Sequence, residues 1–71
     1  MNEATQRLFQ AAKELKNINL PSELARFLNV SQQVIKNWEA RGVSAKMIPE
    51  VAERLGISER WLRTGEGEMI G

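Results

Sequence analysis

Residues 22–42 read SELARFLNVSQQVIKNWEARG, and the spacing of apolar side chains in this stretch decides the fold. Apolar residues at helical spacing flank a short connection at residues 29–31; they are Leu24, Leu28, Ile35 and Trp38. Ala25 falls where two helices joined by so short a turn cross, and its methyl group lets them approach closely. The stretch therefore predicts a helix-turn-helix motif, with Val30 and Ile35 filling the angle between its two helices.

Helical spacing continues on both sides of this motif. The five expected helices span residues 3–16, 21 to near 29, 32–41, 45–55 and 59–63. The first carries an apolar stripe on Leu8, Ala11, Ala12 and Leu15. Pro49 removes an internal hydrogen bond from the fourth, so we expect a kink there, or a one-turn helix with a second start near Pro49. Because no stretch alternates as a strand does, the sequence predicts an all-α fold, a compact bundle of five short helices.

Small polar residues and glycines mark the ends of the expected helices. The N-caps, whose hydroxyls accept from free amides of the first turn, are expected at Ser31, Ser44 and Ser58. The C-terminal ends are expected at Asn29, Gly42, Gly56 and Gly65, because these residue types tolerate the left-handed backbone conformation.

Length and composition exclude several classes of function. Seventy-one residues leave room for one small domain, which we expect to cover residues 1–65, with 66–71 as a tail or the start of a linker. The chain contains no His, Cys, Asp or Tyr, so most suppliers of nucleophiles, general bases and metal ligands are missing. We therefore expect no enzymatic activity, no metal site, no cofactor and no small-molecule substrate.

The net charge of +1 conceals a basic segment. Residues 24–46 contain four basic side chains and one acidic side chain. The first residues, MNEATQRLFQ, lack the basic start and the apolar run of a signal peptide. No apolar run approaches the roughly 20 residues that span a bilayer, so we expect a cytoplasmic protein without membrane contact.

Two stretches carry a resemblance to a known family. Residues 22–42 resemble the helix-turn-helix of lambda-repressor-like domains, and residues 52–69, AERLGISERWLRTGEGEM, resemble the end of the DNA-binding domain of phage CI-type repressors. Together they cover about half of the chain, and the order of the helices extends the resemblance to nearly all of it. Asn29 stands where the family prefers Gly in the turn. Pro21 stands where many members have a phosphate-binding Gln, which removes one expected backbone contact.

The resemblance implies that the helix after Ser31 is a recognition helix that enters the major groove of DNA. An amide side chain can donate to and accept from adenine in a bidentate pair, which suits Gln32, Gln33 and Asn37 as base readers. Val34 is either a contact for a thymine methyl group or a residue at the rim of the core. Phosphate contacts are expected from Ser31, Lys36, Arg41 and Lys46.

The function that the resemblance implies is that of a phage or prophage repressor, which binds double-stranded operator DNA as a homodimer and blocks transcription. A protein with this function is expected at the nucleoid, in the cytoplasm of a bacterial host. Candidate dimer contacts are Trp61, Leu62, Met69 and Ile70. Trp61 and Leu62 also suit a core that closes over the first helix, and we expect at least one of them there. The chain is either the DNA-binding domain of a longer repressor or a short regulator of the Cro type.

An alternative function on the same fold is a helical protein-interaction module, such as an adaptor or an antirepressor. Acidic or apolar residues on the exposed face of the third helix would favour this alternative. That face instead carries three amide side chains and one basic side chain, namely Gln32, Gln33, Asn37 and Lys36.

Overall fold

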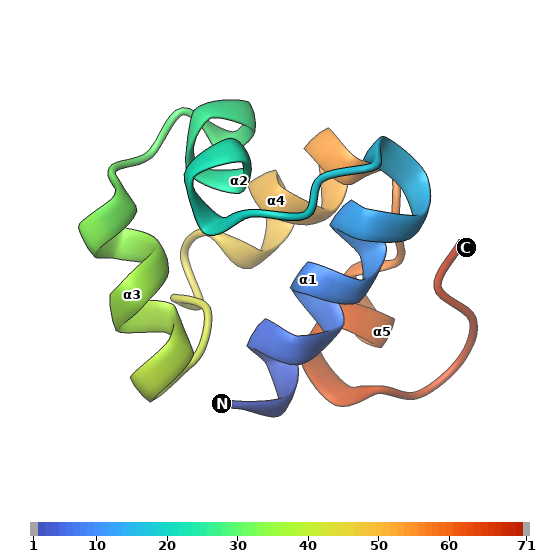
Figure 1. The fold of residues 1–71 in the computed structure, drawn as a ribbon. Coiled ribbons are helices and arrows are strands. Elements are labelled where there is room, and N and C mark those ends of the chain that lie inside the picture. The colour runs from blue at the N-terminus through green and yellow to red at the C-terminus, as the bar shows by residue number, and fades with distance from the viewer. Residues whose placement is uncertain (1, 71) are drawn as a thin grey trace.

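Five α-helices follow one another along residues 2–70, the part of the chain that the computed structural model describes (Figure 1). They are α1 (Glu3–Lys16), α2 (Pro21–Leu28), α3 (Gln32–Arg41), α4 (Ile48–Leu55) and α5 (Glu59–Thr64). No strand occurs within this range, so the predicted all-α class is confirmed. Residues 1 and 71, the outer ends of the expected segments 1–65 and 66–71, lie outside the described residues.

The ends of most helices follow from local sequence. The hydroxyls of Ser31 and Ser58 accept from the N–H groups of Val34 and Trp61, each at 3.2 Å, which confirms both as N-caps. The four predicted C-terminal ends are also confirmed, with positive φ angles at Asn29, Gly42, Gly56 and Gly65. At the start of α1, the side chain of Asn2 accepts from the Ala4 N–H at 2.9 Å.

The fourth helix begins near Pro49, which confirms the alternative of a single turn followed by a second start, but its N-cap differs from the expected one. Residues 45–47 form a turn, and α4 begins at Ile48 with Pro49 in its first turn, where the missing N–H costs nothing. The prediction of Ser44 as a side-chain N-cap is therefore wrong. The backbone carbonyl of Ser44 instead accepts from the N–H groups of Met47 and Ile48, at 2.9 and 3.1 Å, and closes the turn.

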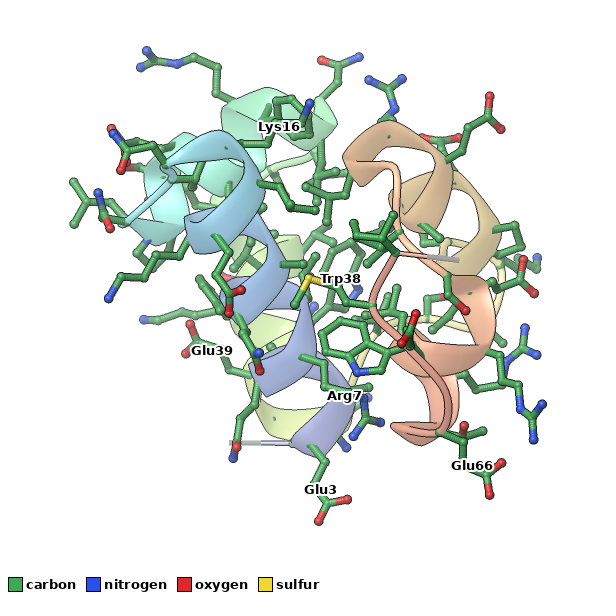
Figure 2. The ribbon with its side chains drawn as sticks, turned by 90° about the vertical axis from the view of Figure 1, so that its right-hand side faces the viewer. Glu3, Arg7, Lys16, Trp38, Glu39 and Glu66 are labelled. Atoms are coloured by element: carbon green, nitrogen blue, oxygen red, sulfur yellow. The ribbon has the colours of Figure 1, made fainter. Side chains whose placement is uncertain are left out.

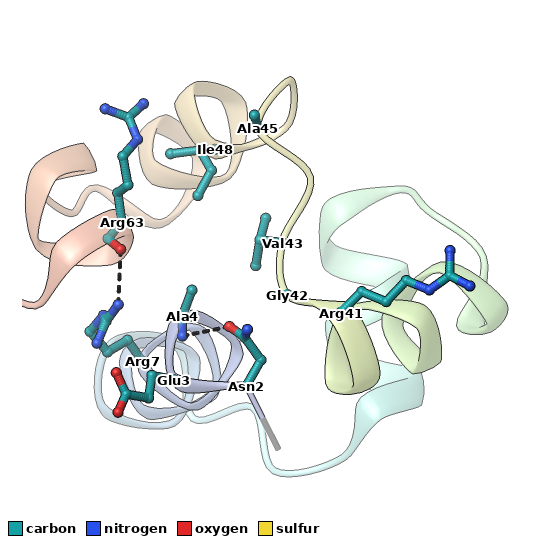
Figure 3. A pocket seen from close by; sticks show the side chains of 10 residues that line it. All are labelled: Asn2, Glu3, Ala4, Arg7, Arg41, Gly42, Val43, Ala45, Ile48 and Arg63. Carbon is teal, nitrogen blue, oxygen red and sulfur yellow. Dashed lines mark hydrogen bonds between the residues drawn. The ribbon is translucent and has the colours of Figure 1, made fainter.

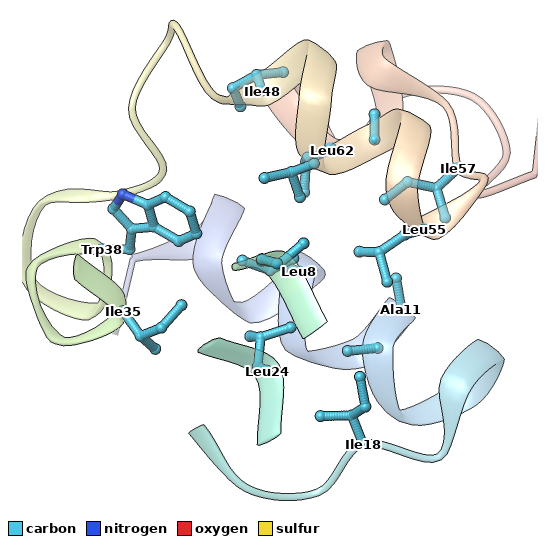
Figure 4. Packing of buried hydrophobic residues seen from close by; sticks show 14 of the residues in the cluster. Leu8, Ala11, Ile18, Leu24, Ile35, Trp38, Ile48, Leu55, Ile57 and Leu62 are labelled. Atoms are coloured by element: carbon cyan, nitrogen blue, oxygen red, sulfur yellow. The ribbon is translucent and has the colours of Figure 1, made fainter. Parts of the chain in front are cut away.

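The core forms around α1, which packs against α3, α4 and α5, while α2 packs on α3 and α5 on α4. Figure 4 shows Leu8 of α1 between Leu24 and Leu62. The largest apolar side chains with almost no exposure are Leu8, Leu24, Leu28, Ile35, Val51 and Leu62. A Cα radius of gyration of 10.7 Å agrees with the roughly 11 Å expected of a compact chain of this length.

One residue of the predicted core stripe is at the surface. The helical period predicts that Leu15 faces inward with Leu8, yet Leu15 is 39% exposed. The chain leaves the helix at Asn17, whose φ of 56° is left-handed, and this turn directs the next apolar residue, Ile18, into the core. The apolar contribution of this end of α1 to the core thus comes from Ile18, after the helix, and not from Leu15.

Candidate nucleic-acid interface

The α2–α3 pair forms the predicted helix-turn-helix. Asn29 adopts φ 59° and ψ 44°, and its N–H donates to the carbonyl of Arg26 at 3.2 Å. The N–H of Val30 donates to the carbonyl of Ala25 at 2.9 Å, which closes the turn. Ala25 is buried between the helices, and Val30 is partly buried against the core. Asn therefore supports here the backbone conformation for which the family prefers Gly.

Helix α3 is held from its inner side by apolar packing and by α1. Ile35 and Trp38 are buried, and Figure 2 shows Trp38 in the interior of the bundle. The hydroxyl of Thr5 on α1, fully buried, donates to the carbonyl of Trp38. The N–H of Asn2 donates to the carbonyl of Glu39 at 3.2 Å. The start of α1 thus fixes the last turns of α3, and with them the direction of its outer face.

The outer face of α3 is polar and exposed. It carries the exposed side chains Gln32, Gln33, Lys36, Asn37 and Arg41. Gln33 Nε2 donates to Asn37 Oδ1 at 3.2 Å, so two of the predicted base readers touch each other. Within the described residues the ion pairs lie on α4 and around α5, so Lys36 and Arg41 keep their charges available to a ligand.

The predicted base readers therefore share one face, with one difference in burial. Val34 is half-buried and packs against the core, so only part of its side chain is available to a ligand. A shallow groove runs beside the readers, between the start of α2 and α3. Its lining residues are Pro21, Gln32, Gln33, Ile35, Lys36 and Glu39.

The predicted phosphate contacts lie on two elements. Ser31 is exposed at the start of α3, and Lys36 and Arg41 extend from that helix. Lys46 lies in the turn before α4 and borders a separate hollow with Pro49. The structure thus groups three of the four with the amide face and leaves Lys46 on the neighbouring turn.

The four candidate dimer contacts differ in accessibility. Leu62 is fully buried and Trp61 is 9% exposed, and both belong to the core that closes over α1. Met69 is partly buried against that core, whereas Ile70 is 54% exposed. A second copy of the chain can therefore reach Ile70 and part of Met69 without any opening of the core.

The segment Thr-Gly-Glu-Gly-Glu, residues 64–68, forms the turn that follows α5. Thr64 Oγ1 donates to the carbonyl of Arg60 at 2.8 Å and accepts from the N–H of Glu66 at 3.1 Å. Glu66 forms an ion pair with Arg60 at 3.1 Å, and Gly65 has φ 82°. These contacts end α5 and turn the chain back, so that the carbonyl of Met69 accepts from the N–H of Ser58 at 2.7 Å.

Arg7 is a residue whose role no local pattern indicates. Its Nε and Nη2 atoms donate to the carbonyls of Leu62 and Arg63 at the end of α5, both at 3.0 Å. Figure 3 shows Arg7 directed toward Arg63 in a pocket between α1, α5 and the segment that follows α3. The same view shows Arg41 at the far border of this pocket, extending away from α1. The guanidinium of Arg7 thus satisfies terminal carbonyls of α5. Arg7 lines the pocket as a structural residue that joins α1 to α5.

Membrane-spanning and metal-binding features are both absent from the described range. No helix between residues 2 and 70 is long and apolar enough to cross a membrane. The same residues hold no group of three or more potential metal-binding side chains.

Comparison with models of known families gave a match over nearly the whole chain. A family model described as the bacteriophage CI repressor helix-turn-helix domain matches residues 3–70. Comparisons with curated proteins and with solved structures returned no match. The matched range takes in the helix-turn-helix, the bundle around it and the returning segment after α5.

Proposed function

Because the chain belongs to the bacteriophage CI repressor helix-turn-helix family, and is thereby a DNA-binding regulator, we propose that it represses transcription by binding operator DNA as a dimer. The observation that carries this proposal is the outer face of α3. Three amide side chains and two basic side chains are exposed there, on a helix whose opposite side is anchored by Ile35 and Trp38.

In the proposed complex α3 lies in the major groove, which accepts an α-helix with its side chains. Gln32, Gln33 and Asn37 hydrogen-bond to base edges, because an amide side chain carries both a donor and an acceptor. The exposed part of Val34 contacts a thymine methyl group. Rigid anchoring supports readout, since a helix free to rotate on the bundle would not hold its side chains in register with the bases.

Phosphate contacts position the domain on the duplex. Lys36 and Arg41 extend from α3 with the amide side chains and contact the DNA backbone. Lys46 reaches a phosphate from the turn before α4. Ser31 adds a contact at the start of α3, where the helix dipole favours an anion.

A dimer places two copies of α3 about one helical turn of DNA apart, roughly 34 Å, and so reads a two-fold symmetric operator. An operator that overlaps a promoter then excludes the polymerase, and no catalysis is needed. In this proposal residues 1–65 form the DNA-binding domain and residues 66–71 are its tail, which folds back on the bundle as far as Met69. The protein works in the cytoplasm of a bacterial host. Ile70, the most exposed of the candidate dimer contacts, is the first to substitute in a test of self-association.

A salt titration tests the proposal. Duplexes of operator length are first selected with the protein from a random pool, and Kd is then measured for a selected and a scrambled duplex at several salt concentrations. We expect the selected duplex to bind at least about 1,000-fold more tightly. Both affinities should fall log-linearly with salt, because binding releases counterions from phosphates. Equal affinity for the two duplexes at every salt concentration contradicts sequence-specific binding, and sedimentation of the complex reports whether two copies are bound.

A further inference from the structure

The hydrogen bond between Gln33 and Asn37 gives the two amides different tasks. Asn37 uses its carbonyl oxygen to accept from Gln33 Nε2 at 3.2 Å. An amide has one carbonyl acceptor and two N–H donors. Asn37 therefore turns its donor group away from Gln33, and Gln33 keeps its own oxygen and one of its two N–H hydrogens free.

We propose that Gln33 and Asn37 read two neighbouring base pairs as one unit, in which Asn37 positions Gln33 on an adenine and donates from its own NH₂ group to a keto base. This inference rests on the proposed function, because it needs α3 in the major groove. The free oxygen and N–H of Gln33 match N6 and N7 of adenine. The free donors of Asn37 match a base edge that presents acceptors alone, which in the major groove is O6 and N7 of guanine or O4 of thymine, whereas adenine places the N6 donor beside its N7 acceptor.

The arrangement follows from the helix. Residues four positions apart lie on the same face, so the two amides meet without distortion of α3. Both side chains are exposed, and in water such a bond competes with solvent. Inside the groove the DNA displaces much of that water, and the bond strengthens in the less polar surroundings. The pair is then a preorganised reader, because each side chain limits the rotamers of the other.

Selection from a random duplex pool tests the pair, because the pool contains every short sequence and the operator emerges from the selection itself. The proteins to compare are the natural chain, Gln33→Ala, Asn37→Ala, Asn37→Asp and the double alanine variant. Gln10→Ala is the matched control, since Gln10 is an exposed glutamine on α1, away from the amide face. All five variants change exposed positions only, and circular dichroism verifies that each keeps its helical content.

The natural protein should enrich adenine at one position and thymine or guanine at the adjacent position. Gln33→Ala should lower the adenine preference about tenfold. Asn37→Ala should lower that same preference as well as the keto preference, and the double variant should lose little more. Asn37→Asp keeps an acceptor for Gln33, so the adenine preference should return while the neighbouring preference changes to cytosine, whose N4 donates to a carboxylate. Gln10→Ala should reproduce the natural profile.

Two results overturn the inference while the proposed function stands. One is an adenine preference that Asn37→Ala leaves intact, which makes the two residues independent readers. The other is a natural profile with cytosine beside the adenine, which means that Asn37 presents its oxygen to the DNA. If the natural protein enriches no sequence, the proposed function and the inference fail together.

Discussion

At the scale of single residues, α3 separates buried from exposed side chains within one turn. Ile35 and Trp38 are buried, while their neighbours Lys36 and Asn37 are exposed. The separation results from the helical period of 3.6 residues, which turns successive side chains by about 100°. A substitution on the outer face should therefore change DNA binding and leave the stability of the domain nearly unchanged.

Gln33→Ala and Lys36→Ala should weaken DNA binding in different ways. In the proposed complex Gln33→Ala removes a contact to a base and should change the preference among sequences by about 1–3 kcal/mol. In the same complex Lys36→Ala removes a contact to phosphate, so it should weaken all duplexes similarly and reduce the slope of log affinity against log salt by about 1. Affinities for a panel of duplexes at several salt concentrations measure both effects. A uniform loss across the panel for Gln33→Ala contradicts its role as a reader.

At the scale of the helices, caps and terminal residues set where each element begins and ends. Gly42 and Gly56 both follow a helix with positive φ, but their surroundings differ. Gly42 has φ 95° and ψ 166°, a region that side chains rarely enter, and a Cβ atom there would lie 2.9 Å from the side chain of Asn2. Gly56 has the milder αL conformation, and a Cβ atom there would meet no atom within 4 Å.

Gly42→Ala should therefore destabilise the protein more than Gly56→Ala. We expect Gly56→Ala to cost about 1 kcal/mol through αL strain alone. Gly42→Ala adds displacement of the Asn2 cap and a less accessible backbone region, for a total of about 2–3 kcal/mol. Urea denaturation of both variants gives the comparison. Equal losses would contradict both the displacement of the Asn2 cap and the additional backbone strain at position 42.

At the scale of the whole molecule, the segment after α5 returns to the bundle. Its carbonyl at Met69 accepts from Ser58, and the side chain of Met69 packs on the core, while the next residue, Ile70, is largely exposed. These neighbouring apolar residues thus have different surroundings. One contributes to the stability of the single chain, and the other is available to a second copy.

Met69→Ala and Ile70→Ala should therefore differ in their effect on the stability of the domain. Met69→Ala should destabilise the domain by about 1–2 kcal/mol, less than the 2–5 kcal/mol typical of a fully buried methionine, because the side chain is only partly buried. Ile70→Ala should change stability by less than about 0.5 kcal/mol. Thermal unfolding measures stability, and sedimentation with and without DNA measures self-association. A large loss of stability for Ile70→Ala contradicts this division.

The interface can be predicted from sequence as far as its residues lie on one helix. The face of α3 follows from periodicity and from its Ser31 cap, so spacing alone groups Gln32, Gln33 and Asn37. The hydrogen bond between Gln33 and Asn37 does not follow, because spacing shows which side chains are neighbours and says nothing of how their amides are oriented. The partial burial of Val34 depends on packing from outside its helix.

By itself, the sequence determined the helices and most of their ends, because these depend on residues within about four positions of one another. It also indicated the helix-turn-helix and the family, because residues 22–42 and 52–69 carry continuous motifs. Only the tertiary structure decided that Leu15 is exposed and Ile18 buried, that Leu62 lies in the core, and that the end of the chain returns to Ser58. The bond from Arg7 to the carbonyl of Arg63 joins residues 56 positions apart. No local pattern in the sequence predicts such a contact, since it forms only when the packing of α1 against α5 brings the two residues together.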